Sequence, residues 1–281
     1  MEIVLARKAG FCFGVKRATQ MAFDAASTKS DAFTLGPIIH SPQVVDRLNQ
    51  MGVRVEKTLD QITAGTVILR SHGVRAEELA EANAKGLDVV DATCPFVRKA
   101  QEHVRFLSSE GYTVIVVGEV EHPEVKGIVS YASGDVHVVA DGAAVASLPR
   151  MAKIGIVAQT TQPFKNLADV VQACLKRGGE IRIFNTICDA TTVRQDEAEH
   201  LAGQVDCMIV VGGYNSANTC RLRELCTAIQ PKTYHIETAE EIDPSWFGSV
   251  DRVGVTAGAS TPKWIIDTVL ERLAEIDNSR L

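Results

Sequence analysis

The chain lacks both an excess of basic residues and a long apolar run, and each absence excludes a class of partner. Its 281 residues include 29 Lys and Arg against 35 Asp and Glu, a net charge of −6. A general nucleic-acid binder needs a basic face, so no nucleic-acid partner is expected. No stretch reaches the roughly 20 apolar residues that a membrane helix needs. The charged start, MEIVLARKAG, does not resemble a signal peptide, so we expect a cytoplasmic protein with no membrane partner.

The seven cysteines lack the C-x2-C spacing of structural zinc sites. Cytoplasmic thiols stay reduced, so some of the seven are expected to bind metal or take part in catalysis and the others to pack in the core. Four fall inside helix-like or strand-like patterns and are expected to have structural roles: Cys174, Cys207, Cys220 and Cys226. No Gly/Ser-rich or low-complexity linker separates parts of the chain.

Short apolar runs alternate with helical patterns along the chain, which predicts an α/β fold with parallel strands. The clearest strand-like runs are TVIVVG (113–118), KIGIVAQ (153–159), CMIVVGG (207–213) and RVGVTAG (252–258). The clearest helical patterns follow Pro163 and Pro262.

The most informative feature is a long internal repeat, marked first by cysteines. Cys12 and Cys94 are 82 residues apart, and Cys94 and Cys188 are 94 apart. A second landmark, a strand ending in glycine with a polar residue four positions later, repeats with the same two offsets: its polar residues are His40, His122 and Ser216. A third landmark, a strand followed by a small polar loop and a helix, has its tips at His72, Thr160 and Ser260.

These landmarks predict three related α/β domains, spanning 14–95, 96–188 and 189–281 together with 1–13, arranged around a common centre. Ligands of α/β sheets bind at the carboxyl ends of the strands, where helix N-termini attract anions. Every landmark residue lies at such a junction, so their side chains are expected to converge on one site.

Three thiols from three repeats indicate a metal centre. Intervals of 82 and 94 residues argue against a zinc knuckle, whereas an iron–sulfur cluster accepts cysteines from distant parts of a fold. A [4Fe–4S] cluster held by Cys12, Cys94 and Cys188 would leave one iron open for a substrate. Two other interpretations keep the thiols but lack substrate chemistry: a cluster-binding redox sensor or electron carrier, and a zinc-stabilised scaffold.

Two of the histidines and one acidic residue could have structural roles instead of functional ones. His40 and His122 could be turn residues before helices, but their equivalence in two repeats favours a site. At the position two residues further on, Glu124 aligns with Pro42 and Asn218 and is the only acid. A carboxyl there could donate protons if burial raised its pKa, or it could simply favour a helix N-terminus.

At these residues the sequence resembles the 4-hydroxy-3-methylbut-2-enyl diphosphate reductase family, of the non-mevalonate isoprenoid pathway. The matching stretches run from residue 10 to residue 262 in the family's order: GFCFGVKRA, SHGV, DATCPFV, EHPEVKG, AQTT, NSAN and TAGASTP. The resemblance implies a trefoil of three α/β domains around an iron–sulfur cluster, an allylic diphosphate substrate and a low-potential electron donor such as ferredoxin or flavodoxin.

The resemblance also implies roles for individual residues. Cys12, Cys94 and Cys188 would be the cluster ligands, and Glu124 the proton donor with help from Thr160. The substrate-binding residues would be His40, His72, His122, Thr160, Ser216, Asn218 and Ser260. Some relatives have serine where this chain has Ala217, so one hydroxyl contact to the diphosphate is expected to be absent or replaced by main chain.

Overall fold

The computed structural model describes residues 1–279 and contains three parallel four-stranded sheets. All strand pairs in them are parallel. In spatial order, one sheet has β3 (Arg54–Glu56), β2 (Ala32–Leu35), β4 (Thr66–Leu69) and β5 (Asp88–Asp91). The next has β7 (Val136–Val139), β6 (Thr113–Val117), β8 (Met151–Ala158) and β9 (Gly178–Ile183). The last has β11 (Thr233–Ile236), β10 (Cys207–Val211), β12 (Arg252–Ala257) and β1 (Glu2–Leu5).

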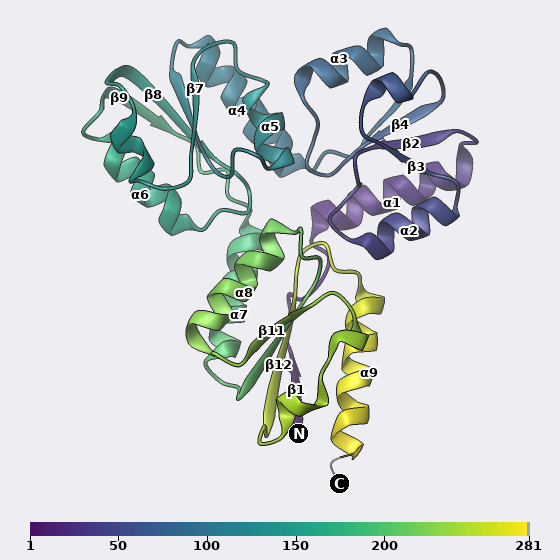
Figure 1. Cartoon of the computed structure of the whole chain (residues 1–281). Coiled ribbons are helices and arrows are strands. Elements are labelled where there is room, and N and C mark those ends of the chain that lie inside the picture. Colours follow the sequence, from purple (N-terminus) through teal and green to yellow (C-terminus); the bar gives the residue numbers. More distant parts are fainter. Residues whose placement is uncertain (280–281) are drawn as a thin grey trace. The chain divides into compact units, whose positions relative to one another are not determined.

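Helices connect the strands and cover both faces of the sheets (Figure 1). They are α1 (Phe13–Thr28), α2 (Pro42–Gln50), α3 (Ala76–Ala84), α4 (Pro95–Ser109), α5 (Pro123–Val129), α6 (Phe164–Cys174), α7 (Asp189–Ala202), α8 (Ala217–Ile229) and α9 (Lys263–Ser279). Short 3-10 turns occur at Leu59–Gln61, Ala144–Ser147, Ala239–Glu241 and Pro244–Phe247. The predicted α/β class, the four predicted strands and the helices after Pro163 and Pro262 are confirmed.

The three sheets share one topology, as the repeat predicted. In two of them the strand that comes first in the chain lies between the second and third, and the fourth takes the edge next to the third. The last sheet has the same order, with the N-terminal strand β1 in the place of the fourth strand. Residues 2–5 therefore share a sheet with strands of the segment 189–281, to which the prediction joined residues 1–13.

The described chain divides into two compact units rather than three. We call the unit that holds both ends of the chain the terminal unit: Met1–Lys16, His40–Asp46 and the chain from Asp189. The middle unit holds Arg17–Ile39 and Arg47–Cys188, and therefore two of the three sheets. Each sheet draws its strands from only one of the three predicted domain ranges, but the boundaries themselves stay a prediction.

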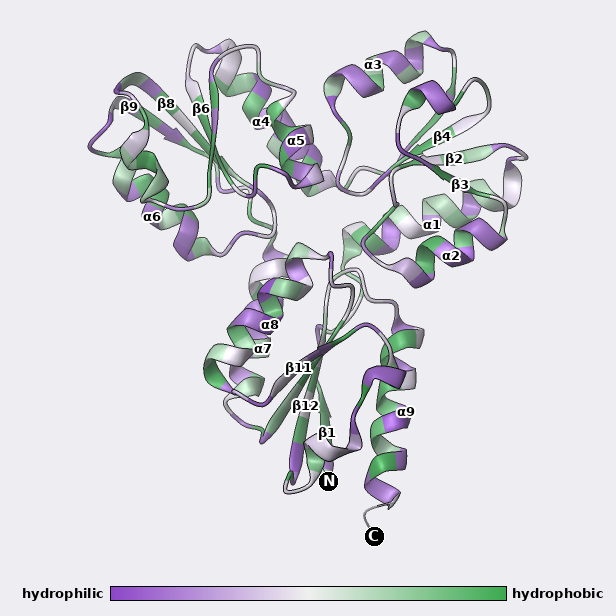
Figure 2. Ribbon diagram, in the orientation of Figure 1, coloured by the Kyte–Doolittle hydropathy of each residue, from purple (hydrophilic) through white to green (hydrophobic). Residues whose placement is uncertain are grey.

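Burial on both faces explains why central strands such as β6 (TVIVV) and β10 (CMIVV) are almost continuously apolar (Figure 2). In β10 the side chains of Ile209 and Val211 pack in one core cluster with α9. Those of Met208 and Val210 pack in another with α7 and α8. In the middle unit β6 and β8 are covered in the same way by α6 on one face and by α4 and α5 on the other.

Three of the cysteines that were expected to be structural lie in these cores. Cys174, Cys207 and Cys226 are completely buried. Burial raises the pKa of the Cys207 and Cys226 thiols to about 12, so both stay protonated and pack as small apolar groups. The fourth, Cys220, is partly exposed on α8 and donates a hydrogen bond to the Tyr214 carbonyl (3.1 Å).

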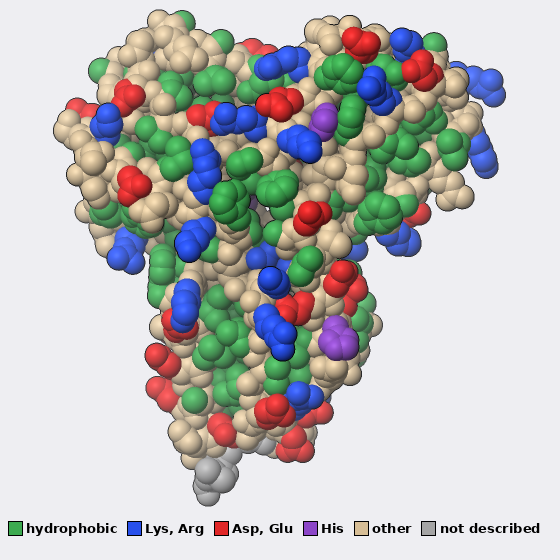
Figure 3. Space-filling model, turned by 180° about the vertical axis from the view of Figure 1, so that it is seen from behind, with side chains coloured by type: hydrophobic (Ala, Val, Ile, Leu, Met, Phe, Trp, Pro, Cys, Tyr) green, Lys and Arg blue, Asp and Glu red, His purple; other side chains and the backbone are tan. Residues whose placement is uncertain are grey.

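The surface mixes charges of both signs. In Figure 3, which shows one face of the molecule, Lys and Arg side chains are interspersed with Asp and Glu side chains. None of the helices within residues 1–279 is long and apolar enough to cross a membrane.

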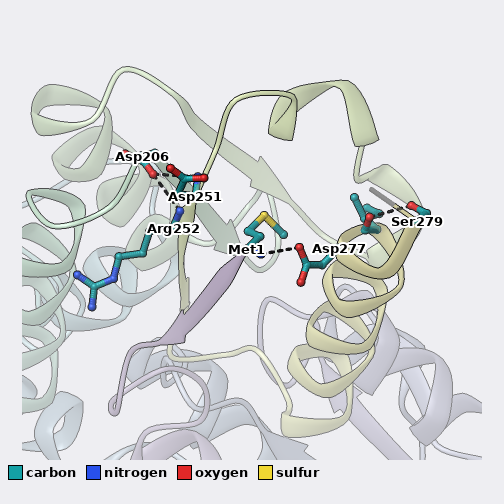
Figure 4. Close-up of polar contacts among 7 residues, drawn as sticks. Met1, Asp206, Asp251, Arg252, Asp277 and Ser279 are labelled. Atoms are coloured by element: carbon teal, nitrogen blue, oxygen red, sulfur yellow. Dashed lines mark hydrogen bonds and ion pairs between the residues drawn. The ribbon is translucent and has the colours of Figure 1, made fainter. Parts of the chain in front are cut away.

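The N-terminal strand is fastened to the last sheet at the end of that sheet where the strands begin. The Met1 amino group lies 2.6 Å from a carboxylate oxygen of Asp277 on α9 (Figure 4). Nearby, Asp206 accepts hydrogen bonds from the amides of Asp251 and Arg252 at 3.1 and 2.9 Å. These contacts are consistent with β1 acting as the missing fourth strand of a sheet whose other strands are more than 200 residues away in sequence.

The packing of α4 on β8 predicts a stability contrast between two leucines. Leu107 is fully buried, and a Cβ on Gly155 of β8 would lie 2.8 Å from its methyl carbons. Leu107→Ala is expected to lower the free energy of unfolding by about 2–5 kcal/mol through lost burial and a cavity. Leu175→Ala, the same change at a residue 66% exposed, is the matched control and is expected to cost less than about 0.5 kcal/mol. Equal losses in urea denaturation would contradict this packing.

Candidate functional site

The residues predicted for the site all follow carboxyl ends of parallel strands, where α/β folds bind ligands. In the middle unit the set is His72 after β4, Cys94 after β5, His122 and Glu124 after β6, Thr160 after β8, and Cys188 after β9. In the terminal unit the set is Cys12 after β1, Ser216 and Asn218 after β10, Ser260 after β12, and His40.

The centre of the middle unit's set is a buried carboxyl. Glu124 lies in the first turn of α5 and is only 2% exposed. One of its oxygens accepts a hydrogen bond from the Thr160 backbone N–H (2.6 Å), and the other accepts one from the Thr160 hydroxyl (2.8 Å). The carboxyl and the Thr160 side chain therefore form one hydrogen-bonded unit between the loops that follow β6 and β8.

This environment places the titration of Glu124 near neutrality. Burial raises its pKa from 4.5 to about 7, because removing water destabilises the carboxylate. The two hydrogen bonds from Thr160 act in the opposite direction but are outweighed. A carboxyl with such a pKa can both hold and release a proton near pH 7, as a general acid requires.

Two histidines lie beside this carboxyl. His122 is the N-cap residue of α5, and its Nδ1 accepts a hydrogen bond from the Glu124 backbone N–H (3.1 Å). Nδ1 is therefore the acceptor in this contact and carries no proton there. The His72 ring meets the His122 ring edge to face, with 5.7 Å between the centroids.

Backbone hydrogen bonds connect both cysteines of the middle unit to this group. The Cys94 N–H donates to the Ser71 carbonyl (2.9 Å), next to His72, and the Cys188 N–H donates to the Thr160 carbonyl (3.0 Å). These contacts link the loops that carry the six residues predicted in this unit, and the roles of those residues stay predictions.

The terminal unit assembles a second polar group. The Ser260 hydroxyl lies 3.4 Å from the Ser216 hydroxyl and donates to the His40 carbonyl (3.2 Å). Ser216 is the N-cap residue of α8, where its oxygen accepts a long hydrogen bond from the Thr219 N–H (3.4 Å). The Cys12 N–H donates to the carbonyl of Ala259, the neighbour of Ser260 (3.2 Å).

Asn218 is the unusual member of this group. Its side chain is only 5% exposed, and within residues 1–279 neither its amide oxygen nor its amide nitrogen has a hydrogen-bond partner. Leaving a buried polar group unsatisfied costs about 1–3 kcal/mol. Asn218 sits in the first turn of α8, where backbone N–H groups also lack intrahelical partners. Its unsatisfied amide and the helix N-terminus are together suited to an anionic oxygen ligand.

Glycines let the loops of this group approach one another. A Cβ on Gly258 would lie 2.0 Å from the Thr219 hydroxyl, and one on Gly213 would lie 2.7 Å from the His40 carbonyl. Neither position has room for a larger residue. Glycine at these two positions therefore has a packing reason.

The three predicted cluster ligands occupy equivalent places. Cys12, Cys94 and Cys188 each follow the edge strand of their sheet and directly precede a helix, and each is partly exposed, unlike the core cysteines. A helix N-terminus favours negative ligand atoms, and iron–sulfur clusters are held by thiolates. Cys12 belongs to the terminal unit and the other two to the middle unit. In the described part of the chain no three His, Cys, Asp or Glu side chains are grouped as a metal site. The three thiols nevertheless have the chemistry and the equivalent setting that such a cluster needs.

Sequence reasoning missed residues that hold these loops. Gln159 is fully buried, and its amide oxygen accepts from the Glu119 N–H (3.1 Å), which joins the loops after β6 and β8. His235, which is not part of the sequence repeat, contacts the Gly212 carbonyl (2.8 Å) in the loop that carries Ser216. Gln159 adjoins Thr160 in the AQTT motif, which was an available signal; His235 had none.

The Glu124 environment predicts a measurable titration. In infrared difference spectra of the wild-type protein minus Glu124→Gln, we expect a band of the protonated carboxyl. This band should disappear as the pH rises, with a midpoint near pH 7. Glu121→Gln is the control, because Glu121 is exposed and its ion pair with Lys126 lowers its pKa. A band that is already absent at pH 5 would contradict the effect of burial.

Comparison with known proteins identifies relatives along the whole chain. Residues 3–274 match the family model described as LytB protein. A Geobacter sulfurreducens protein named 4-hydroxy-3-methylbut-2-enyl diphosphate reductase is 68% identical over 280 residues, covering 100% of this chain and 99% of that protein. A protein of the same name from Trichlorobacter lovleyi is 67% identical over 279 residues, covering 99% and 100%.

Solved structures of similarly named enzymes share the fold. One, described as (E)-4-hydroxy-3-methyl-but-2-enyl diphosphate reductase, the terminal enzyme of the non-mevalonate pathway, is 45% identical with a TM-score of 0.72 and covers 98% of this chain and 100% of its own. The E-1-hydroxy-2-methyl-but-2-enyl-4-diphosphate reductase from Plasmodium falciparum is 26% identical with a TM-score of 0.91 and covers 97% and 88%. The resemblance found in the sequence motifs is thereby confirmed, and the chain belongs to the LytB family.

Proposed function

We propose that this protein is a 4-hydroxy-3-methylbut-2-enyl diphosphate reductase. The reaction breaks the allylic C–O bond, consumes two electrons and two protons, and releases water with isopentenyl and dimethylallyl diphosphates. The observation that carries the proposal is the buried Glu124 carboxyl, bonded twice to Thr160 in the unit that also holds two of the three candidate ligand cysteines. The names of the relatives agree with it.

Glu124 and Thr160 are the proposed proton donors. A hydroxyl that leaves from an allylic carbon needs a proton to become water, and a carboxyl with a pKa of about 7 can supply it. The Thr160 hydroxyl, 2.8 Å from a Glu124 oxygen, can pass a proton between that carboxyl and the substrate. These two groups give the middle unit the properties of an acid catalyst.

The diphosphate is the proposed anchor of the substrate. Ser216, Asn218 and Ser260 offer hydroxyl and amide donors, and the α8 N-terminus, where Ala217 stands, offers main-chain N–H groups. The histidines are assigned to the same ligand: His40, His72 and His122. Binding energy from these contacts, remote from the reacting carbon, would position the allylic end for reaction.

Cys12, Cys94 and Cys188 are the proposed ligands of one [4Fe–4S] cluster. When bound, such a cluster supplies one-electron transfers and, with only three protein thiolates, an iron open to an oxygen ligand. The three proposed domains would each contribute one of these thiols.

The electrons must come from a separate low-potential carrier, for which we propose a ferredoxin or flavodoxin. The ligand thiols must stay reduced, and the cytoplasm is the compartment we propose because it keeps them so.

The proton-donor assignment predicts a specific loss in one variant. Glu124→Gln keeps the size of the side chain and can still hydrogen-bond to Thr160, but it cannot release a proton. In anaerobic assays with the allylic diphosphate and a low-potential reductant, turnover is expected to fall by about 100-fold or more, with little change in substrate binding. Glu121→Gln, in the same loop region and exposed, should keep wild-type turnover. Full activity of Glu124→Gln would remove this residue from the mechanism.

The cluster assignment predicts which thiols bind iron. After anaerobic reconstitution, Cys12→Ala, Cys94→Ala and Cys188→Ala are each expected to lose most of the brown absorbance and bound iron of the wild-type protein. Cys174→Ala is the control, because this buried cysteine packs against apolar side chains of the middle unit. A colourless wild-type protein that contains zinc would instead support the scaffold alternative.

A further inference from the structure

Tyr214 lies in the loop that joins β10 to α8 and so precedes the cap residue Ser216. Its side chain is 48% exposed, which is high for an aromatic residue, yet it is held on several sides. The ring packs against the His235 ring with 4.7 Å between the centroids. The hydroxyl donates a short hydrogen bond to the Glu241 carboxylate.

The backbone of the same loop is held by side chains. The Tyr214 N–H donates to a carboxylate oxygen of Glu237 (2.7 Å), and its carbonyl accepts from the Cys220 thiol (3.1 Å). Two residues earlier, the Gly212 carbonyl accepts from His235 Nε2 (2.8 Å). The Gly212 carbonyl and both backbone groups of Tyr214 thus bond to side chains.

Most of these partners come from one short segment, 235–241, which has hydrogen bonds of its own. It begins in β11 and continues into the 3-10 turn Ala239–Glu241. The second oxygen of Glu241 accepts from the N–H groups of Glu237 and Thr238, both at 3.0 Å. Glu241 therefore fixes its own segment with one oxygen and Tyr214 with the other.

The two glutamates of this segment, Glu237 and Glu241, hold a loop that leads to a proposed anion site. Glu237 and Glu241 stand beside the loop that leads to Ser216 and Asn218, where bare carboxylates would disfavour a diphosphate. Here both accept hydrogen bonds from the loop. Burial and the bond to Glu241 raise the pKa of Tyr214 to about 12, so its hydroxyl remains a donor at any physiological pH.

We propose that Tyr214, together with His235, Glu237 and Glu241, is a positioning residue that sets the loop of Ser216 and Asn218 for the diphosphate of the substrate. The proposal rests on the proposed function and deepens it. None of the four is placed against the substrate or the reacting atoms, so they act through the loop. Their loss should weaken binding of the diphosphate while leaving the bond-breaking step unchanged, which appears as a change in KM rather than in kcat.

Two matched pairs of variants test this. Tyr214→Phe removes only the hydroxyl, and Tyr234→Phe makes the same change on β11 at a ring that stacks on Trp246 (3.9 Å between centroids). Glu237→Ala removes the acceptor of the Tyr214 N–H, whereas Glu237→Gln keeps an oxygen there without charge. The measurements are the Kd of inorganic pyrophosphate by calorimetry, and kcat and KM for the allylic diphosphate, on the full reconstituted chain.

Tyr214→Phe and Glu237→Ala are each expected to raise the pyrophosphate Kd and the KM by about 10-fold, the usual effect of losing a hydrogen bond to a charged partner. Their kcat, and both constants of Tyr234→Phe and Glu237→Gln, should stay at wild-type values. If Tyr214→Phe and Glu237→Ala lower only the melting temperature and leave Kd and KM unchanged in an active protein, the four residues are merely structural and this inference is wrong. A wild-type protein that neither binds pyrophosphate nor turns over would overturn the proposed function as well.

Discussion

The structure depends most on the pair formed by Glu124 and Thr160, because a buried carboxyl is stable only where the fold supplies its hydrogen bonds. Burial alone would make the carboxylate very unfavourable. The Thr160 N–H and hydroxyl lower that cost, one to each oxygen, so that the two protonation states become nearly equal in free energy around pH 7. Such a balance requires two loops to hold their positions closely. The two loops follow strands β6 and β8, which are paired neighbours in a parallel sheet.

All three sheets have the same strand topology, so the position of Glu124 has an equivalent position in each of the other two. The equivalent strands β2, β6 and β10 each lead to a helix whose first turn carries a residue of the repeat: Pro42, Glu124 and Asn218 occupy the aligned position. The backbone supplies the same place, and the side chain decides the chemistry. A carboxyl there can hold or release a proton, and a carboxamide there can donate to and accept from a ligand. The repeated fold thus supports different tasks through single substitutions at equivalent points.

Much of the fold was predictable from the sequence, because the repeat preserves the types of element and residue as well as their spacing. Strand, glycine, polar residue and helix recur in order, so the parallel sheets and the loop positions of Cys94, His122 and Thr160 followed without coordinates. The partners of those residues did not follow. Gln159 and His235 act through contacts with segments distant in sequence, and no local pattern distinguishes His235 from a surface histidine. The raised pKa of Glu124 also required the burial that only the folded chain shows.

The two polar groups differ in how far their hydrogen bonds are already made, and this difference has a physical meaning. Glu124 is satisfied on both oxygens, so its proton affinity is set by the protein before any ligand arrives. The buried Asn218 amide has no partner within the described residues, so the protein carries a cost there that a ligand with suitable oxygen atoms would remove. The proposed reaction needs a controlled proton and a firmly bound diphosphate, and this contrast supports that proposal. In the proposed function, the state of the proton donor Glu124 does not depend on the ligand, whereas the proposed anchor Asn218 gains most when a ligand completes its hydrogen bonds.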